Sequence, residues 1–325
     1  MKVGGIFLKH QLLKVHGSNN TFYLYDSLYE DEMDWVHLTK SLCNPNNNDG
    51  ADGLLLVLPS ETADAKMRVI NADGSEASMC GNGLRCVARY ICEKLNVDEA
   101  IIETMKANLT VRKEAPIFGD LPTYAVEISP VSFDLHSLPM QYKNKTEIKN
   151  EVIPKFAEDI LFTAVSVPNP HLIGMVDKKY IENVAHQQKL ASYLNGENDY
   201  FPDGVNVSYV YPISESEIFV RTYERGVGFT NACGTAMTAS ALIAKLYDYV
   251  NVQKIMVYNP GGFVQCDIGI CGNDYELSLI GNATVLGNYE INSNLHFLGC
   301  FITEEQLQYE KCNVFVKEKL GNLIY

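Results

Sequence analysis

Two cysteines in this sequence, Cys80 and Cys233, stand in matching local contexts. Each precedes a glycine at the start of a segment whose apolar residues recur at helical spacing. The first block reads MRVINADGSEASMCGNGLRCVARY, and the second reads FVRTYERGVGFTNACGTAMTASAL. With the two cysteines aligned, Asn71 falls on Glu224. Each block predicts a strand, a turn, a cysteine, a glycine and a helix, and such a repeat predicts two similar halves.

A thiol at the start of a helix is placed for proton transfer. The first N–H groups of a helix have no partner within it and carry about half a positive charge, which stabilises a nearby anion by about 0.3–1 kcal/mol. A cysteine with a reference pKa of about 8.5 becomes a plausible base near neutral pH in that position. Two such thiols flanking one molecule would take a proton from one face of a carbon and deliver one to the other. This is the chemistry of a two-base racemase or epimerase.

The same helix starts offer groups that bind a carboxylate. The backbone N–H groups of Gly81, Asn82, Gly234 and Thr235 would clamp the α-carboxylate and stabilise the charge left by proton removal. No sequence motif indicates a cofactor-binding site, so we expect no cofactor. A single cysteine is most often an inert core residue, and only the pairing favours catalysis.

Composition bounds the class of protein. The chain has 325 residues, 46% of them hydrophobic and 20% charged, which predicts a globular protein of two domains. Its net charge of −14 argues against nucleic acid or an anionic membrane as a partner, and favours a small-molecule substrate. The sequence has no apolar run of membrane-spanning length and no signal peptide, so we expect a cytoplasmic location. Nine cysteines without a Cys-x-x-Cys pair predict reduced thiols and no metal site.

Short strand-like runs separated by Gly, Asn, Asp and Pro dominate the chain and predict antiparallel β-structure. The runs are FYLYD, GLLLVLP, MRVIN, AIIETM, TYAVEIS, AVSVPN, VNVSYVY, EIFVRTY, KIMVYN and YELSLIGNATVLG. Helical spacing is clear over residues 83–95 and 234–249, and weaker over 179–194 and 305–318.

Five motifs resemble those of the diaminopimelate epimerase family, in order from about residue 12 to about residue 288. MRVINADGSEASMCGNGLRCVARY and YERGVGFTNACGTAMTA resemble its two cysteine blocks, and VSVPNPHLIGMVD resembles its Asn-Pro-His segment. FPDGVNVSYV is similar to its Pro-x-x-x-Asn-Val segment, and KVHGSNNTFYLYD to its N-terminal strand and turn. Enzymes of this family interconvert LL- and meso-diaminopimelate without a cofactor, in lysine and peptidoglycan precursor biosynthesis.

The resemblance assigns roles to residues at matching positions. Cys80 and Cys233 would be the acid/base pair, and His171 and Glu224 would lie beside the thiols and orient or tune them. Arg225 would pair with the distal carboxylate. The remaining substrate-binding residues implied in this way are Asn20, Asn71, Asn169 and Asn206, besides the helix-start residues Gly81, Asn82, Gly234 and Thr235.

The resemblance implies an α+β fold of two pseudo-symmetric halves, each an antiparallel β-barrel-like sheet around a central helix, with the active site between them. The first half would span residues 1–133 and the second 134–283, with last core strands near 284–292 returning to the first half. Residues 293–325 would form an extension of unknown role, with a strand and a helix. The family also suggests a homodimer.

Some positions depart from the family pattern. Thr21 replaces an acid in the N-terminal motif, and Phe229 replaces the glutamate of Gly-Glu-Thr before the second cysteine. Gly53 follows Asp52 where some members carry glutamine. The loss of a carboxylate at residue 229 predicts a change in thiol pKa or helix capping near Cys233, and no loss of the reaction.

Three alternative functions share parts of this sequence pattern. Another amino-acid racemase on the same scaffold, acting on histidine or proline, would share both thiols and differ in the distal pocket. An isomerase of the phenazine-biosynthesis type would work without the cysteine pair, and a non-catalytic binding or scaffold protein would have lost at least one cysteine. Arg225, Asn71 and Asn206 favour a substrate with a second charged amino-acid head group.

Overall fold

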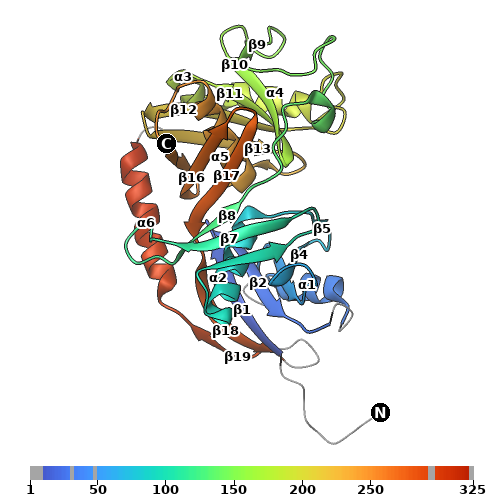
Figure 1. The fold of residues 1–325 in the computed structure, drawn as a ribbon, viewed down its shortest axis with the longest axis vertical. Helices are drawn as coiled ribbons and strands as arrows, with labels where there is room; N and C mark the ends of the chain where they lie inside the picture. Colours follow the sequence, from blue (N-terminus) through green and yellow to red (C-terminus); the bar gives the residue numbers. More distant parts are fainter. Residues whose placement is uncertain (1–9, 30–32, 47–49, 292–296, 322–325) are drawn as a thin grey trace, which may run out of the picture. The chain divides into compact units, whose positions relative to one another are not determined.

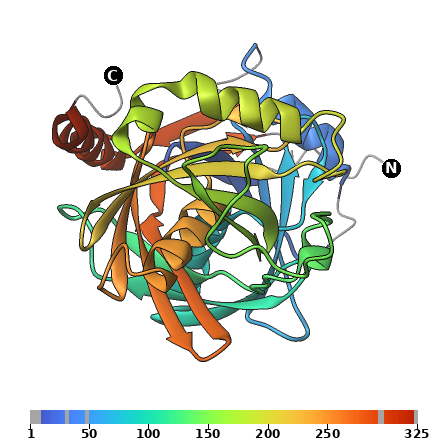
Figure 2. The ribbon, with the colours of Figure 1, turned by 90° about the horizontal axis from the view of Figure 1, so that it is seen from above.

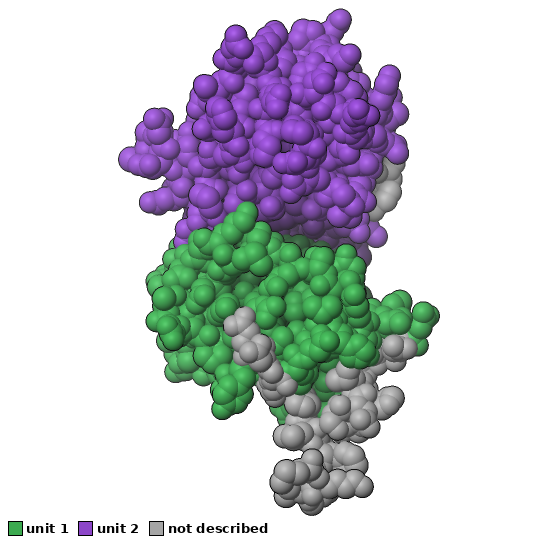
Figure 3. Space-filling model, turned by 90° about the vertical axis from the view of Figure 1, so that its right-hand side faces the viewer, with its two compact units in different colours: residues 1–126, 281–311 green, residues 127–280, 312–325 purple. Residues whose placement is uncertain are grey.

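The computed structural model describes residues 10–29, 33–46, 50–291 and 297–321, and it has an α+β fold with many strands and few helices (Figure 1). The chain divides into two compact units, coloured separately in Figure 3. Unit 1 comprises Met1–Val126 and Gly281–Lys311, and unit 2 comprises Glu127–Ile280 and Cys312–Tyr325. The sequence placed the changes between halves near residues 133 and 283, whereas the units change at 126/127 and 280/281.

Unit 1 is a sheet packed around helix α2 (Gly81–Leu95) and bordered by α1 (Trp35–Cys43). Helix α2 contacts most of the strands of this unit, and its first eight residues, 81–88, are all buried. The strands are β1 (His10–Gly17), β2 (Asn20–Asp26), β3 (Gly53–Leu58), β4 (Ala65–Asn71), β5 (Glu76–Ala77), β6 (Glu99–Glu103), β7 (Asn108–Glu114), most of β8 (Thr123–Glu127), β18 (Thr284–Ile291) and β19 (Phe297–Ile302).

Unit 2 is built in the same manner around α5 (Gly234–Leu246), which lies among its strands (Figure 2). Helices α3 (Lys178–Glu182) and α4 (Val184–Leu194) and a short 3-10 turn, Leu135–Ser137, complete this unit. Its strands are β9 (Glu151–Val152), β10 (Leu161–Val167), β11 (Asn169–Met175), β12 (Asn206–Ser214), β13 (Glu217–Glu224), β14 (Gly228–Phe229), β15 (Lys254–Asn259), β16 (Gly262–Cys271) and most of β17 (Asp274–Asn282).

The two units share one order of strand pairing. In unit 1, β1 pairs with β2, β2 with β3, β3 with β4, and β4 with both β5 and β6. In unit 2, β10 pairs with β11, β11 with β12, β12 with β13, and β13 with both β14 and β15. In each order the cysteine-led helix follows the short fifth strand, so α2 and α5 occupy equivalent places in the pairing scheme.

The sheets are mixed, although the sequence predicted antiparallel structure. Strands β2 and β3, β4 and β6, β11 and β12, and β13 and β15 pair in parallel. Parallel neighbours need a crossover between them, and in each case the intervening chain carries a helix or a helix pair. The strand runs themselves do not encode direction, because a short apolar run fits either kind of ladder.

The two clearest predicted helices are confirmed, and one helix was missed. The segment 179–194 breaks at Asn183, whose side chain accepts the N–H of Ala185 and begins α4. Helix α1 was missed because it is short, yet it begins after an N-cap aspartate, Asp34, and buries Trp35, Leu38 and Leu42 on one face. No helix within the described ranges is long and apolar enough to cross a membrane.

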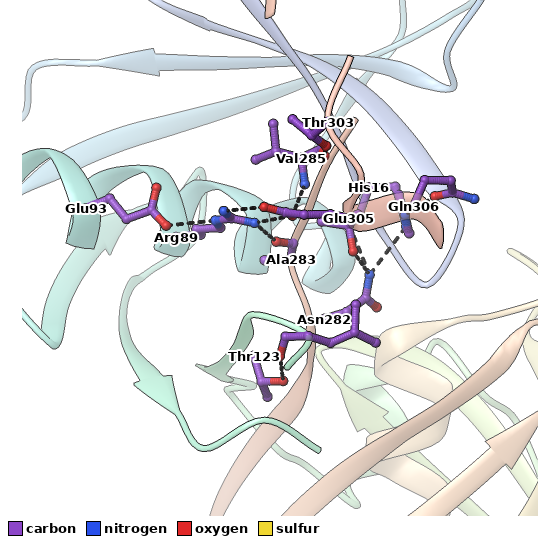
Figure 4. Close-up of polar contacts among 12 residues, drawn as sticks. His16, Arg89, Glu93, Thr123, Asn282, Ala283, Val285, Thr303, Glu305 and Gln306 are labelled. Carbon is purple, nitrogen blue, oxygen red and sulfur yellow. Dashed lines mark hydrogen bonds and ion pairs between the residues drawn. The ribbon is translucent and has the colours of Figure 1, made fainter. Parts of the chain in front are cut away.

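The C-terminal segment forms the strand and the helix that its sequence predicted, β19 and α6 (Glu305–Leu320). Figure 4 shows the start of α6 in unit 1, where Glu305 forms a bidentate ion pair with Arg89 at 2.6 and 2.8 Å. The same carboxylate accepts the N–H of Val285 at 2.9 Å, and Arg89 also donates to the carbonyl of Ala283 at 2.7 Å. Because both partners of the ion pair are mostly buried and further hydrogen-bonded, this contact fixes the first turn of α6 on unit 1.

Candidate functional site

Cys80 is the N-cap residue of α2. Its backbone is extended, and its sulfur accepts the N–H of Gly83 at 3.4 Å, so the thiol lies against the positive end of the helix. The side chain is half-buried, and its Sγ lies 3.6 Å from the amide oxygen of Asn20. The structure therefore brings together Cys80, Asn20 and Asn82, whose Nδ2 donates to the same amide oxygen at 3.4 Å.

Asp52 orients the Asn20 amide, a role that the sequence did not reveal. Its Oδ2 accepts from Asn20 Nδ2 at 2.9 Å, and from the backbone N–H and hydroxyl of Thr21 at 2.8 and 3.2 Å. With the NH₂ group held by Asp52, the Asn20 oxygen faces the thiol of Cys80. The carboxylate that Thr21 lacks is thus present nearby, on the residue just before β3, the strand parallel to β2. The available signal was the Asp-Gly pair at the start of the run GLLLVLP.

Two glycines near this site allow neighbouring backbone segments to pack closely together. A Cβ atom on Gly17 would lie 2.7 Å from the carbonyl oxygen of Asn82, so the turn between β1 and β2 can approach the helix only with glycine there. A Cβ atom on Gly53 would lie 2.5 Å from the carbonyl oxygen of Ile70. This packing explains why a glutamine does not fit at residue 53.

Asn71 ends β4 opposite Gly53 and closes a turn. Its backbone N–H donates to the backbone carbonyl of Ser75 at 2.8 Å, and its side-chain Nδ2 donates to the Ser75 hydroxyl at 3.0 Å. The side chain is half-buried.

Cys233 is the N-cap residue of α5 and is half-buried. Its Sγ lies 3.6 Å from the hydroxyl of Thr235, in the first turn of the helix. Burial, and next the carboxylate of Glu224, raise the pKa of the Cys233 thiol well above its usual range. Cys233 therefore carries its proton at neutral pH, which is the state of a proton donor.

Glu224 and Phe229 lie on neighbouring strands before α5. The Glu224 carboxylate accepts the hydroxyl of Thr230, which fixes it beside the second cysteine block. Phe229 is partly exposed and packs edge-on against Tyr223 at 5.2 Å between ring centroids. The guanidinium of Arg221 lies 5.8 Å from its ring centroid. Phe229 therefore adds an aromatic contact to β13, while Glu224 supplies the carboxylate that acts on Cys233.

His171 is fully buried on β11, and its two ring nitrogens have no hydrogen-bond partner among the described residues. Burial, and next the charge of Arg225, lower its pKa to about 3. The imidazole is therefore neutral, and one ring nitrogen is a bare acceptor while the other is a donor.

We expect His171 to make stability depend on pH. Its native pKa is about 3 against 6.5 for the free side chain, so between these values the unfolded chain binds a proton that the native protein does not. The free energy of unfolding should fall by about 2 kcal/mol through this residue between pH 7 and pH 5. Urea unfolding followed by circular dichroism at both pH values measures the fall. His171→Phe should reduce it and His37→Gln, at an exposed position, should not; equal pH dependence in wild type and His171→Phe would contradict the assignment.

Two other predicted binding residues of unit 2, Asn206 and Arg225, meet just after the end of β13. Asn206 is buried at the start of β12, beside His171 in the parallel ladder, and its Oδ1 accepts the backbone N–H of Arg225 at 2.8 Å. The exposed Arg225 side chain donates to the carbonyl of Asp203 at 3.2 Å. Asn169 is half-buried at the start of β11.

Each unit thus contains some of the predicted site residues. Unit 1 places Cys80, Gly81, Asn82 and Asn20 in contact at one helix start, with Asn71 at the end of β4. Unit 2 places Cys233, Gly234 and Thr235 at the other helix start, with Glu224 acting on the thiol. Over the described part of the chain, no group of three or more His, Cys, Asp or Glu side chains could hold a metal ion.

Comparison with known proteins gives one consistent family. A family model described as diaminopimelate epimerase matches residues 12–115 and 163–286. The diaminopimelate epimerase of Listeria welshimeri is 48% identical over 323 residues, covering 94% of this chain and 97% of its own. That of Enterococcus faecalis is 45% identical over 316 residues, covering 92% and 96%. An alignment covering 94% of the chain must include part of residues 293–325, which lie beyond the family model.

Solved structures share the fold at low sequence identity. A PhzF-family phenazine biosynthesis protein of Bacillus anthracis is 13% identical with a TM-score of 0.62, covering 87% of this chain and 99% of its own. A hydroxyproline epimerase from Agrobacterium vitis is 12% identical with a TM-score of 0.55, covering 88% and 93%. These likenesses concern the fold alone, whereas the sequence matches extend over most of the chain. The chain therefore belongs to the diaminopimelate epimerase family.

Proposed function

We propose that this chain interconverts LL- and meso-diaminopimelate by two-base proton transfer at the α-carbon, without a cofactor. The observation that carries the proposal is that each unit presents a half-buried cysteine as the N-cap of its central helix. Sequence identity of 48% to a relative named diaminopimelate epimerase supports the choice of substrate.

The reaction needs both thiols at one α-carbon, one on each face. One cysteine, as thiolate, removes the α-proton, and the electron pair of the broken C–H bond spreads onto the carboxylate. The other cysteine, as thiol, donates its proton to the opposite face, so the configuration inverts and the two sulfurs exchange protonation states. The raised pKa of the Cys233 thiol supports its role as the donor in the state described here.

The surrounding residues stabilise the charge that forms. The backbone N–H groups at Gly81, Asn82, Gly234 and Thr235 lie at helix starts, where an anion is favoured, and would bind the α-carboxylate. Asn20, Asn71, Asn169 and Asn206 would bind the ammonium and carboxylate groups through their side-chain amides. Arg225 would pair with the distal carboxylate. The neutral His171 and the carboxyl group of Glu224 would orient the substrate and the Cys233 thiol.

We also propose the setting that this activity implies. The enzyme would work in the cytoplasm, in lysine and peptidoglycan precursor biosynthesis, as a homodimer.

Exchange of the α-proton in D₂O tests the proposal directly. The purified chain, kept reduced, is incubated with LL-diaminopimelate, meso-diaminopimelate, histidine, proline and lysine, and deuterium at the α-carbon is followed by NMR. We expect exchange and epimerisation of diaminopimelate alone, because only this substrate offers a distal amino-acid head group to Arg225. If the α-proton of proline or histidine exchanged instead, the chain would be a racemase of that amino acid. Absence of exchange from every amino acid would overturn the catalytic proposal.

A further inference from the structure

The first turn of α6, in the C-terminal segment, reaches a histidine beside the Cys80 site. The Nε2 atom of His16 lies 3.0 Å from the amide oxygen of Gln306, although 290 positions separate the two residues (Figure 4). The ring of Tyr309 packs edge-on against the imidazole at 4.6 Å between centroids. All three residues belong to unit 1.

The hydrogen bonds around His16 define its tautomer. Its Nδ1 accepts the backbone N–H of Asn19 at 3.1 Å, so this nitrogen carries no hydrogen. The hydrogen is therefore on Nε2 and is donated to Gln306. The amide of Gln306 is oriented in turn, because its Nε2 donates to Glu310 at 3.5 Å and leaves the oxygen for His16. His16 is almost fully buried, and burial above all lowers its pKa to about 4, consistent with a neutral ring.

The bond from Asn19 to His16 supports the turn that presents Asn20. Ser18 and Asn19 form a two-residue hairpin turn in which both have positive φ, 54° and 62°. The N–H of Ser18 donates to the side-chain oxygen of Asn282 at 2.9 Å, and the Ser18 hydroxyl oxygen accepts from the guanidinium of Arg85, in α2, at 3.0 Å. Asn20 follows at once, with its amide oxygen 3.6 Å from the Cys80 sulfur.

We propose that Gln306 is a positioning residue for the Cys80 site: by accepting the Nε2 hydrogen of His16, it keeps Nδ1 free to hold the turn that places Asn20 against the thiol. Without that acceptor, the Nε2–H group of the buried ring loses its hydrogen-bond partner, which weakens the preference for this tautomer relative to the Nδ1–H form. The other tautomer would set an Nδ1–H group against the N–H of Asn19, two donors face to face. This gives the C-terminal segment a role in the reaction, and the kinetic part of the inference rests on the proposed function.

Gln306→Met tests the inference, because it keeps the length of the side chain and removes the acceptor. Gln306→Glu restores an acceptor oxygen, and Gln308→Met is the matched control at an exposed position on the same helix. We expect Gln306→Met to lower kcat for diaminopimelate about tenfold with KM within about twofold, a change of about 1.4 kcal/mol in the barrier. The kcat of Gln306→Glu should stay within about threefold of the wild-type value, and the kcat of Gln308→Met should equal the wild-type value.

Two readouts do not depend on turnover. The ¹⁵N spectrum of His16 at pH 7 reports the tautomer, and the rate at which iodoacetamide alkylates Cys80, followed by peptide mass spectrometry, reports the thiol. We expect Gln306→Met to shift His16 away from the pure Nε2–H form and to change the Cys80 alkylation rate at least threefold. Gln306→Asn, which withdraws the amide by one methylene, should act in the same direction and serves if Gln306→Met does not fold.

The outcomes separate the two proposals. Wild-type tautomer and alkylation rate in both Gln306→Met and Gln306→Asn would overturn the positioning role, whatever the activity. If the wild-type chain exchanges no amino-acid α-proton while these variants still alter His16 and Cys80, the proposed function fails and the positioning of the thiol stands.

Discussion

Cys80→Ala and Cys233→Ala should each lower kcat for epimerisation by about 10²- to 10⁴-fold, the range that one general acid or base contributes. Each variant lacks the proton donor or acceptor on one face of the α-carbon, and the remaining thiol cannot serve both faces. Epimerisation of LL-diaminopimelate, followed by chiral separation of the products, measures the loss.

The stereochemistry of residual exchange makes this prediction sharper. In D₂O each single variant should exchange the α-proton only at a centre whose C–H bond faces the thiol that remains, and with retention of configuration. The two variants should therefore act on opposite configurations. Cys271→Ala, which removes an exposed thiol, is the control and should leave the rate unchanged. Substantial epimerisation by either active-site variant would contradict the two-base mechanism.

Arg225→Ala should lower kcat/KM for diaminopimelate about 100-fold. A guanidinium paired with a carboxylate contributes about 1.5–3 kcal/mol, and Arg225 is exposed with donors beyond its one bond to Asp203. Part of that energy is expected to act on kcat, because it positions the α-carbon between the thiols. Arg225→Lys, which keeps the charge without the planar fork, should recover only part of the loss.

A substrate analogue separates binding from folding in this test. An analogue that lacks the distal carboxylate should react equally slowly with wild type and with Arg225→Ala, since it makes no ion pair in either. Arg112→Ala, at a partly exposed arginine of β7, is the matched control. An unchanged kcat/KM for diaminopimelate in Arg225→Ala would place the distal carboxylate elsewhere.

Short stretches of sequence encoded the parts of this protein that depend on neighbours along the chain. The start of a helix is set by a few consecutive residues, and the blocks around Cys80 and Cys233 were sufficient to predict two cysteines at the N-termini of two helices. The apolar spacing of 83–95 and 234–249 predicted that these helices are buried, as α2 and α5 are.

Whether strands pair in parallel or antiparallel could not be predicted from short stretches of sequence. The runs GLLLVLP and VNVSYVY are recognisable as strands, and whether each pairs in parallel or antiparallel depends on the helical crossover that precedes it. The orientation of Asn20 likewise depends on Asp52, which adjoins it only because β2 and β3 are parallel.

The C-terminal segment shows most clearly which features follow from local sequence and which follow from tertiary structure. The sequence by itself determined that this segment can form a strand and a helix, and that two thiols stand at helix starts. Only the tertiary structure decided that Gln306 meets His16 and that Glu305 pairs with Arg89. The physical reason is range: helix starts and apolar faces arise from residues within a few positions of each other, whereas the direction of a side-chain hydrogen bond depends on partners that only the folded chain brings together.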